Sequence, residues 1–192
     1  MNVYDFDGTI YKGDSSVDFA KYCLGKNKKC RRAVPRMIGA GIRYALKQIS
    51  TKDFKVFFFS FLRALEPDEI DELVAEFWQT HKDRIVSWYK AKQSDDDVII
   101  SASPRFLLEP ILTDLGIKNL IATEMNKSSG VIRGENCKGA EKVRRLRNEY
   151  PGVHIDHFYS DSLSDHPLAE IADEAFLVNR EQIAPWPGKG ET

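Results

Sequence analysis

Short apolar runs of strand length recur along the chain, and helical patterns separate most of them from the second run onward. An apolar run between polar flanks is typical of a strand that is buried on both faces of a parallel sheet. The sequence therefore predicts an α/β fold, with a Rossmann-like parallel sheet and helices on both of its faces. The predicted strands cover residues 3–6, 98–101, 120–123, 157–160 and 175–178.

Signals for a helix follow the second predicted strand. Ser103 is expected to cap its amino terminus and Pro104 to be its first residue, because proline is favoured where the backbone N–H has no partner. Gly116 is expected to end this helix.

Between Asp14 and about Asp97 the pattern changes to helical periodicity without a convincing strand. The clearest helix is expected over residues 66–92, where apolar residues recur along one stripe. This stripe is expected to fill the interior of a small bundle. We therefore divide the chain into a Rossmann-like core of residues 1–13 and 97–192 and an inserted all-helical cap of residues 14–96.

Residues 28–47, within this insert, contain seven basic residues and no acidic one. A solvated helix face is the usual explanation for such a run. The alternative is an electrostatic guide for an anionic substrate, with Arg36 and Arg43 as substrate-reading residues. The segment is also compatible with peripheral contact at a membrane surface, although the apolar stretch at residues 54–62 fits the bundle interior better.

Composition and charge exclude several classes of protein. The 28 Lys and Arg residues nearly balance the 29 Asp and Glu residues, so the formal charge of -1 gives no global reason to expect a nucleic-acid partner. The sequence predicts no signal peptide and no apolar stretch that spans a membrane. Cys23, Cys30 and Cys137 have no CxxC spacing, which favours reduced thiols and a cytoplasmic location.

Two carboxylates stand at the end of the first predicted strand. Asp5 and Asp7 are followed by Gly8, which permits a tight loop. Ligands bind outside the carboxyl ends of strands in an open parallel sheet, and the period of two directs both side chains to one side. Like charges this close repel unless a cation lies between them or one is protonated. Mg²⁺ meets this need, whereas an Asx-turn with solvated carboxylates is the structural alternative.

Polar residues at later strand and helix ends indicate a phosphate site. Ser101 ends the second predicted strand, before a helix start whose amides attract anions, although an N-cap role also explains it. Lys138 begins a later helical pattern and Lys142 lies one turn further on the same face, where a lysine balances phosphoryl charge. Asp161 ends the fourth predicted strand and is expected to complete the metal site. Capping alone is an adequate explanation for Asp165.

Four segments, Asp-x-Asp-Gly-Thr, apolar strand-Ser, Lys-Gly and Ser-Asp-x3-Asp, occur in this order and together resemble the motifs of the haloacid dehalogenase superfamily of phosphohydrolases. The resemblance spans nearly the whole chain. It is greatest to phosphoserine-phosphatase-like members, which carry a helical cap between the first and second motifs. It implies a Mg²⁺ cofactor, a small-molecule phosphate ester as substrate, and hydrolysis through an aspartyl-phosphate.

The resemblance also implies a role for each motif residue. Asp5 would be the nucleophile, and Asp7 the general acid and later the general base. Mg²⁺ would be held by Asp5, the backbone carbonyl of Asp7 and Asp161, with Asp165 in support. Asp14 would read the substrate, unless it only caps a helix. The implied phosphate-binding residues are Gly8, Thr9, Ser101, Ala102 and Lys138, which precedes Gly139, with Lys142 as the alternative lysine.

The motifs leave the substrate and the reaction partly open. Ala102-Ser103 stands where many relatives have Gly-Gly, which argues against phosphoserine as the substrate. The expected substrate is a small phosphorylated metabolite or a lipid-headgroup phosphate. Asp7 distinguishes the chain from dehalogenases, which lack this aspartate. A phosphomutase or phosphotransferase is the alternative. Asp7 and the cap disfavour a noncatalytic phosphate-binding regulator. The second acidic strand end and the short chain disfavour a glycosyltransferase.

Overall fold

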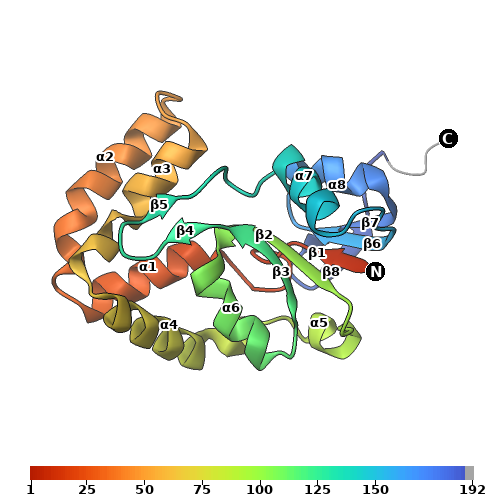
Figure 1. Cartoon of the computed structure of the whole chain (residues 1–192), viewed down its shortest axis with the longest axis horizontal. Coiled ribbons are helices and arrows are strands. Elements are labelled where there is room, and N and C mark those ends of the chain that lie inside the picture. Colours follow the sequence, from red (N-terminus) through yellow and green to blue (C-terminus); the bar gives the residue numbers. More distant parts are fainter. Residues whose placement is uncertain (189–192) are drawn as a thin grey trace.

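The computed structural model of the chain describes residues 1–188, in which six strands form one sheet in the order β3-β2-β1-β6-β7-β8 (Figure 1). These strands are β1 (Asn2–Tyr4), β2 (Val98–Pro104), β3 (Asn119–Thr123), β6 (Ile155–Ser160), β7 (Ala172–Asn179) and β8 (Gln182–Pro185). The first five of them run parallel to one another. The predicted strands are therefore all present, in the predicted arrangement.

One edge of the sheet has a strand that the pattern did not predict. β8 pairs with β7 in the antiparallel direction, because only residues 180 and 181 separate the two strands and Arg180 adopts a φ of 58° in the turn. Two residues suffice for a hairpin, whereas a parallel neighbour needs a long crossover. A second hairpin that the pattern did not predict consists of β4 (Met125–Asn126) and β5 (Val131–Ile132).

Helices cover both faces of the sheet, as predicted. Successive strand side chains point to opposite faces, so Tyr4 and Ile99 belong to one buried cluster and Val3 and Ile100 to the other. The first cluster includes buried leucines of α6, and the second includes Leu146 of α7 and buried residues of α8. These helices are α6 (Arg105–Asp114), α7 (Ala140–Glu149) and α8 (His166–Ile171).

The regular structure between β1 and β2 is helical, apart from isolated bridges. The α-helices of this helical segment (residues 15–92) are α1 (Ser15–Lys26), α2 (Val34–Ala45), α3 (Thr51–Phe58), α4 (Pro67–His81) and α5 (Ser87–Lys92). The single helix expected over residues 66–92 is therefore broken. Ile85 forms an isolated bridge with Tyr11, and the Val86 N–H donates to the Ile10 carbonyl at 2.9 Å. These bonds hold the chain extended and tie the two ends of the segment together.

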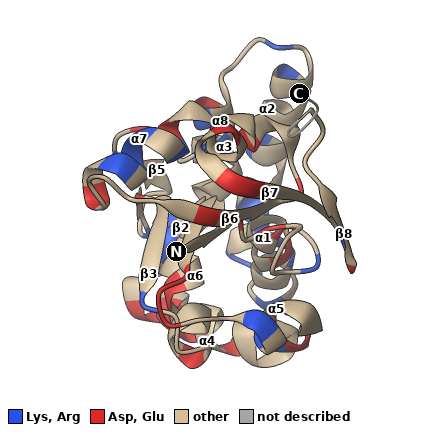
Figure 2. Cartoon of the chain, turned by 90° about the vertical axis from the view of Figure 1, so that its right-hand side faces the viewer, with Lys and Arg blue, Asp and Glu red and all other residues tan. Residues whose placement is uncertain are grey.

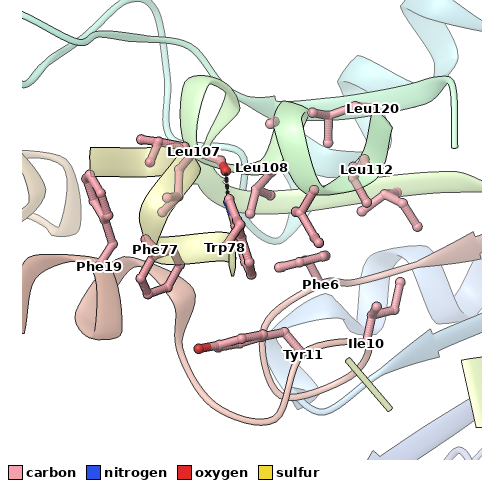
Figure 3. Close-up of a cluster of buried hydrophobic side chains, with 14 of the residues drawn as sticks. Phe6, Ile10, Tyr11, Phe19, Phe77, Trp78, Leu107, Leu108, Leu112 and Leu120 are labelled. Atoms are coloured by element: carbon pink, nitrogen blue, oxygen red, sulfur yellow. Dashed lines mark hydrogen bonds between the residues drawn. The ribbon is translucent and has the colours of Figure 1, made fainter. Parts of the chain in front are cut away.

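Trp78 of α4 joins the helical segment to the sheet. Its side chain is 3 % exposed, and its indole N–H donates to the Leu107 carbonyl of α6 at 2.6 Å. Its ring makes edge contacts with Phe6, which follows β1, and with Tyr11 (Figure 3). The stripe expected to fill a separate bundle thus belongs to a core that continues onto the sheet.

The start of α6 differs from the prediction. β2 extends to Pro104, which has a β-region conformation and is the N-cap residue, and the helix begins at Arg105. Ser103 does not cap the helix, because its hydroxyl donates to Asp7. Leu115 and Gly116 end the helix as predicted, and Gly116 has a φ of 77°.

We expect Trp78→Phe to lower the free energy of unfolding by about 1–3 kcal/mol, because the Leu107 carbonyl loses its indole donor in a buried place. Urea denaturation measures this change. Trp88→Phe is the matched control, since the indole N–H of Trp88 is buried and has no hydrogen-bond partner within residues 1–188. Equal losses in the two variants would contradict a role for the hydrogen bond.

Candidate active site

The carboxyl ends of β1, β2 and β6 meet at a cavity of about 400 Å³. Residues from distant parts of the chain line it together, including residues of α1 and α3 from the helical segment. Of the predicted site residues, the cavity collects Asp5, Asp7, Gly8, Asp14, Ser101, Ala102, Lys138, Lys142, Asp161 and Asp165. Parallel strands present their carboxyl ends at one edge of the sheet, which explains why these side chains converge.

Lys142 forms the central ion pair of this cavity. Its ammonium nitrogen lies 2.8 Å from Asp5 Oδ1 and 2.6 Å from Asp165 Oδ2, and the side chain is 2 % exposed. Burial alone would lower the pKa of Lys142, but the two carboxylates outweigh it and raise the pKa. Burial raises the pKa of Asp5, while Lys142 opposes that change. Lys142 is therefore a permanently charged partner for the carboxylate at the end of β1.

The structure gives the lysine position at Asp5 to Lys142 and not to Lys138, which the sequence favoured. Lys138 is exposed before the Gly139 N-cap of α7, and it only lines the cavity. Lys142 lies in the first turn of α7, where side chains tilt toward the helix amino terminus and thus back toward the sheet edge. Sequence spacing could not distinguish the two lysines, because Lys138 lies just before α7 and Lys142 lies in its first turn.

Asp7 is held by two donors. The Ser15 N–H donates to Asp7 Oδ1 at 2.6 Å, and the Ser103 hydroxyl donates to Asp7 Oδ2 at 2.5 Å. Since the hydroxyl hydrogen of Ser103 is used in this bond, the Ser16 hydroxyl is the donor in its 2.8 Å contact with Ser103. Burial, and next the charge of Asp14, raise the pKa of Asp7 to about 7. The carboxyl is thus both oriented and able to exchange a proton near neutral pH.

Asp161 lies against the loop that follows Asp7. A Cβ placed on Gly8, which has a φ of 73°, would stand 2.0 Å from Asp161 Oδ2, so only glycine permits this approach. Burial, and next the charges of Asp5 and Asp165, raise the pKa of Asp161 to about 6. No described residue forms an ion pair with Asp161. Asp161 itself keeps part of its surface exposed, next to the buried carboxylates of Asp5 and Asp165, whose charges raise its pKa. Carboxylates gathered in this way suit a hard divalent cation.

Another group of potential ligands lies at the opposite end of the strands. His154, Asp156 and Asp173 are exposed near the amino ends of β6 and β7, where Figure 2 shows acidic segments. Asp156 already pairs with the amino terminus of Met1 at 2.6 Å. This group is therefore distinct from the cavity at the carboxyl ends.

Lys55 of α3 is a cavity residue that the sequence analysis missed. Its ammonium group donates to the Ala102 carbonyl at 2.6 Å and to Asn136 Oδ1 at 2.9 Å. Burial lowers its pKa to about 8. The available signal was a single cation inside the otherwise apolar stretch of residues 54–62. Lys55 brings a positive charge from the helical segment to the end of β2.

Three predicted residues do not line the cavity. Arg36 and Arg43 are exposed on α2. Thr9 is fully buried beside the loop, and its hydroxyl has no hydrogen-bond partner among the described residues. Asp14 was predicted either to read the substrate or to cap a helix. It lines the cavity, and as the N-cap residue of α1 its side chain also accepts from the Val17 N–H at 2.9 Å.

Comparison with known proteins identifies the family. Residues 3–170 match the model of the haloacid dehalogenase-like hydrolases. The chain belongs to this family. Protein CicA of Caulobacter vibrioides is 30 % identical over 185 residues, which cover 89 % of this chain and 82 % of that protein.

Solved structures confirm the fold of this haloacid dehalogenase-like hydrolase. A protein of unknown function from Bordetella pertussis has a TM-score of 0.77 at 23 % identity, covering 98 % of this chain and 91 % of that one. A phosphoserine phosphatase, solved as a phospho-aspartyl intermediate analogue, has a TM-score of 0.52 at 15 % identity, covering 90 % and 83 %. The predicted superfamily is confirmed, and the relatives named as phosphatases support a phosphatase.

We expect Gly8→Ala to reduce hydrolysis of p-nitrophenyl phosphate at least about 100-fold, because the new Cβ must displace the Asp161 carboxylate. Gly152→Ala is the matched control, since Gly152 has the same φ of 73° but no atom within 4 Å of the added Cβ. Both variants should lose about 1–2 kcal/mol of stability from the left-handed backbone. Activity that falls equally in both would contradict the importance of the contact with Asp161.

The lowered pKa of Lys55 gives a pH-dependent prediction. Between about pH 8 and its ordinary pKa of 10.5, the folded protein binds fewer protons at Lys55 than the unfolded chain. The contribution of Lys55 to the free energy of unfolding should therefore become more favourable as the pH rises through this interval. The free energy of unfolding of the wild type minus that of Lys55→Met should increase, as measured by urea denaturation. Lys21→Met, exposed on α1, controls for the loss of one charge, and a flat or falling difference would contradict burial of Lys55.

Proposed function

We propose that the protein is a Mg²⁺-dependent phosphomonoesterase that forms an aspartyl-phosphate on Asp5. The observation that carries this proposal is the convergence of Asp5, Asp7 and Asp161 on one cavity around the ion pair of Lys142. The family and its phosphatase relatives support the same reaction class. The substrate is a small phosphate ester, either a phosphorylated metabolite or a lipid-headgroup phosphate.

In the first step, an oxygen of Asp5 attacks the phosphorus atom and the bond from phosphorus to the ester oxygen breaks. Asp7 gives its proton to the departing alkoxide, which is consistent with its raised pKa and with the serine contacts that orient it. In the second step, Asp7 takes a proton from water as the water oxygen attacks phosphorus. The bond between phosphorus and the Asp5 oxygen then breaks, which restores the Asp5 carboxylate and releases inorganic phosphate.

Charge on the transferring group requires fixed donors and cations. We assign Lys142 to this role in place of Lys138, because Lys142 reaches the nucleophile. Asp165 holds Lys142 at this position. The Ser101 hydroxyl accepts from the Ser103 N–H at 3.0 Å, so its own hydrogen can donate to a phosphoryl oxygen.

The residues that would hold Mg²⁺ are Asp5, Asp161 and the backbone carbonyl of Asp7. The ion would supply charge neutralisation between the nucleophile and the phosphoryl oxygens. The pKa values of Asp5, which is buried, and of Asp161, which is partly exposed, are both raised by desolvation and next by neighbouring carboxylates, and a cation is favourable beside such a group.

We assign residues 14–96 to a cap domain and residues 1–13 and 97–192 to the core that carries the reaction. The cap supplies Lys55 and Thr51 to the cavity wall, so it contributes to substrate choice and excludes water. A cytoplasmic location remains our expectation, because Cys23, Cys30 and Cys137 are buried free thiols.

The protein should hydrolyse p-nitrophenyl phosphate with Mg²⁺, and Asp5→Asn should reduce the rate at least about 10⁴-fold, because the amide is a poor nucleophile. EDTA should reduce the wild-type rate, and added Mg²⁺ should restore it. Asp114→Asn, at the exposed end of α6, is the matched control and should retain the wild-type rate. Activity of Asp5→Asn that persists in EDTA would overturn the proposed reaction.

A further inference from the structure

α2 has apolar side chains on two opposite faces. Met37 and Ala40 point inward, and the ring of Tyr44, which is 38 % exposed, stacks on Phe54 of α3 with the ring centroids 4.8 Å apart. Ile38 and Ile42, and Leu46 at the C-cap, are 59 %, 57 % and 62 % exposed. With 100° between successive helical residues, these three side chains form one stripe on the side away from α3. A helix that is apolar all round is normally buried, but no described residue covers this stripe.

Basic residues border the exposed stripe. Arg36 and Arg43 lie seven residues apart on α2, about two helical turns, while Arg32 comes shortly before the helix and Lys47 directly after its C-cap residue. None of these four forms an ion pair with an acidic residue among residues 1–188. The segment of residues 28–47 contains no acidic residue at all. We call the stripe and its basic border the outer face of α2.

We propose that the outer face of α2 docks on the surface of an anionic lipid bilayer. A helix that combines exposed isoleucine and leucine with neighbouring arginine and lysine lies in the membrane interface, with its apolar side chains among the acyl chains and its cations at the headgroups. No helix in the described chain is long and apolar enough to cross a membrane, which agrees with a position on the surface. This inference does not depend on the proposed phosphatase reaction.

Charge distinguishes a bilayer from other occupants. A second copy of this chain bound through the same face would place Arg36 and Arg43 near their own equivalents, because a two-fold interface is self-complementary. Like charges at such an interface are unfavourable. Single-stranded nucleic acid binds by stacking on exposed aromatic rings, whereas the ring of Tyr44 is already stacked on Phe54. An anionic, apolar surface satisfies both parts of the outer face.

The docking face and the cavity lie on two neighbouring helices. α3 packs on α2, and the Tyr44 hydroxyl lies 3.1 Å from Thr51 Oγ1. Thr51 and Lys55 of α3 also line the cavity. α2 and α3 lie side by side at one end of the molecule in Figure 1. A bilayer bound by α2 would therefore contact the helix that packs on α3, and α3 forms one wall of the cavity.

Vesicle flotation with the full chain tests the proposal. We expect the protein to bind phosphatidylcholine vesicles that contain about 30 mol% phosphatidylserine, and to bind pure phosphatidylcholine at least about 10-fold less. Ile38→Ser/Ile42→Ser/Leu46→Ser should lower the bound fraction at least about 10-fold. Arg36→Glu/Arg43→Glu should lower it by more than roughly 20-fold, since each charge near the surface is worth roughly fivefold. Binding should also weaken in about 1 M salt, where the Debye length is about 3 Å.

Matched controls separate the outer face from general surface properties. Ile171→Ser/Ile183→Ser changes exposed apolar residues elsewhere, and Lys118→Glu/Arg147→Glu reverses two exposed charges elsewhere. Both should bind vesicles like the wild type. The triple serine variant should keep its unfolding temperature and its rate on p-nitrophenyl phosphate, because its side chains are exposed and outside the cavity.

Three results would overturn the proposal. The first is the absence of wild-type binding to the anionic vesicles, and the second is equal loss of binding in the controls and in the outer-face variants. The third is a wild-type dimer that the triple serine variant converts to a monomer in light scattering while vesicle binding is unchanged. That result would assign the outer face to a second copy. All three are independent of whether Asp5→Asn abolishes hydrolysis.

Discussion

The buried ion pair of Lys142 with Asp5 and Asp165 is the interaction on which the cavity depends. It joins the first turn of α7 to the end of β1 and to the residues after β6. Removing one partner of a buried ion pair costs about 3–5 kcal/mol, because the remaining charge is left without compensation. The position of α7 against the sheet and the position of the Asp5 carboxylate are therefore fixed by the same contact.

The other carboxylates of the cavity have less compensation. Asp7 has two hydrogen-bond donors, and its pKa is raised to about 7, whereas Asp161 has no ion pair among the described residues. Crowding of this kind is unfavourable for the protein alone, and it would become favourable with the cation and the phosphoryl group that we propose for this site. Strain of this sort at functional sites is offset by the packing around them. Here the surrounding core is continuous, since Trp78 connects α4 to α6 and to the chain after β1.

The helical segment contributes to function on two sides. Its inner side places Lys55 and Thr51 in the cavity wall, and its outer side exposes Ile38, Ile42 and their basic neighbours. Because the segment shares its core with the sheet and its ends are bonded to each other near Tyr11 and Ile85, it is not an independent bundle. A surface contact at α2 and a ligand in the cavity therefore act on connected parts of the molecule.

The sequence by itself determined the five parallel strands and the acidic residues at their ends, because apolar runs and the two-residue period are local properties. It therefore located Asp5, Asp7 and Asp161, and the family followed from their order. Only the tertiary structure decided which lysine meets Asp5, because that contact joins residues 137 positions apart and depends on how α7 packs. The same holds for Lys55, whose direction is set by the rotation of α3 against its neighbours. Periodicity specifies the face of a helix, whereas packing decides what that face meets.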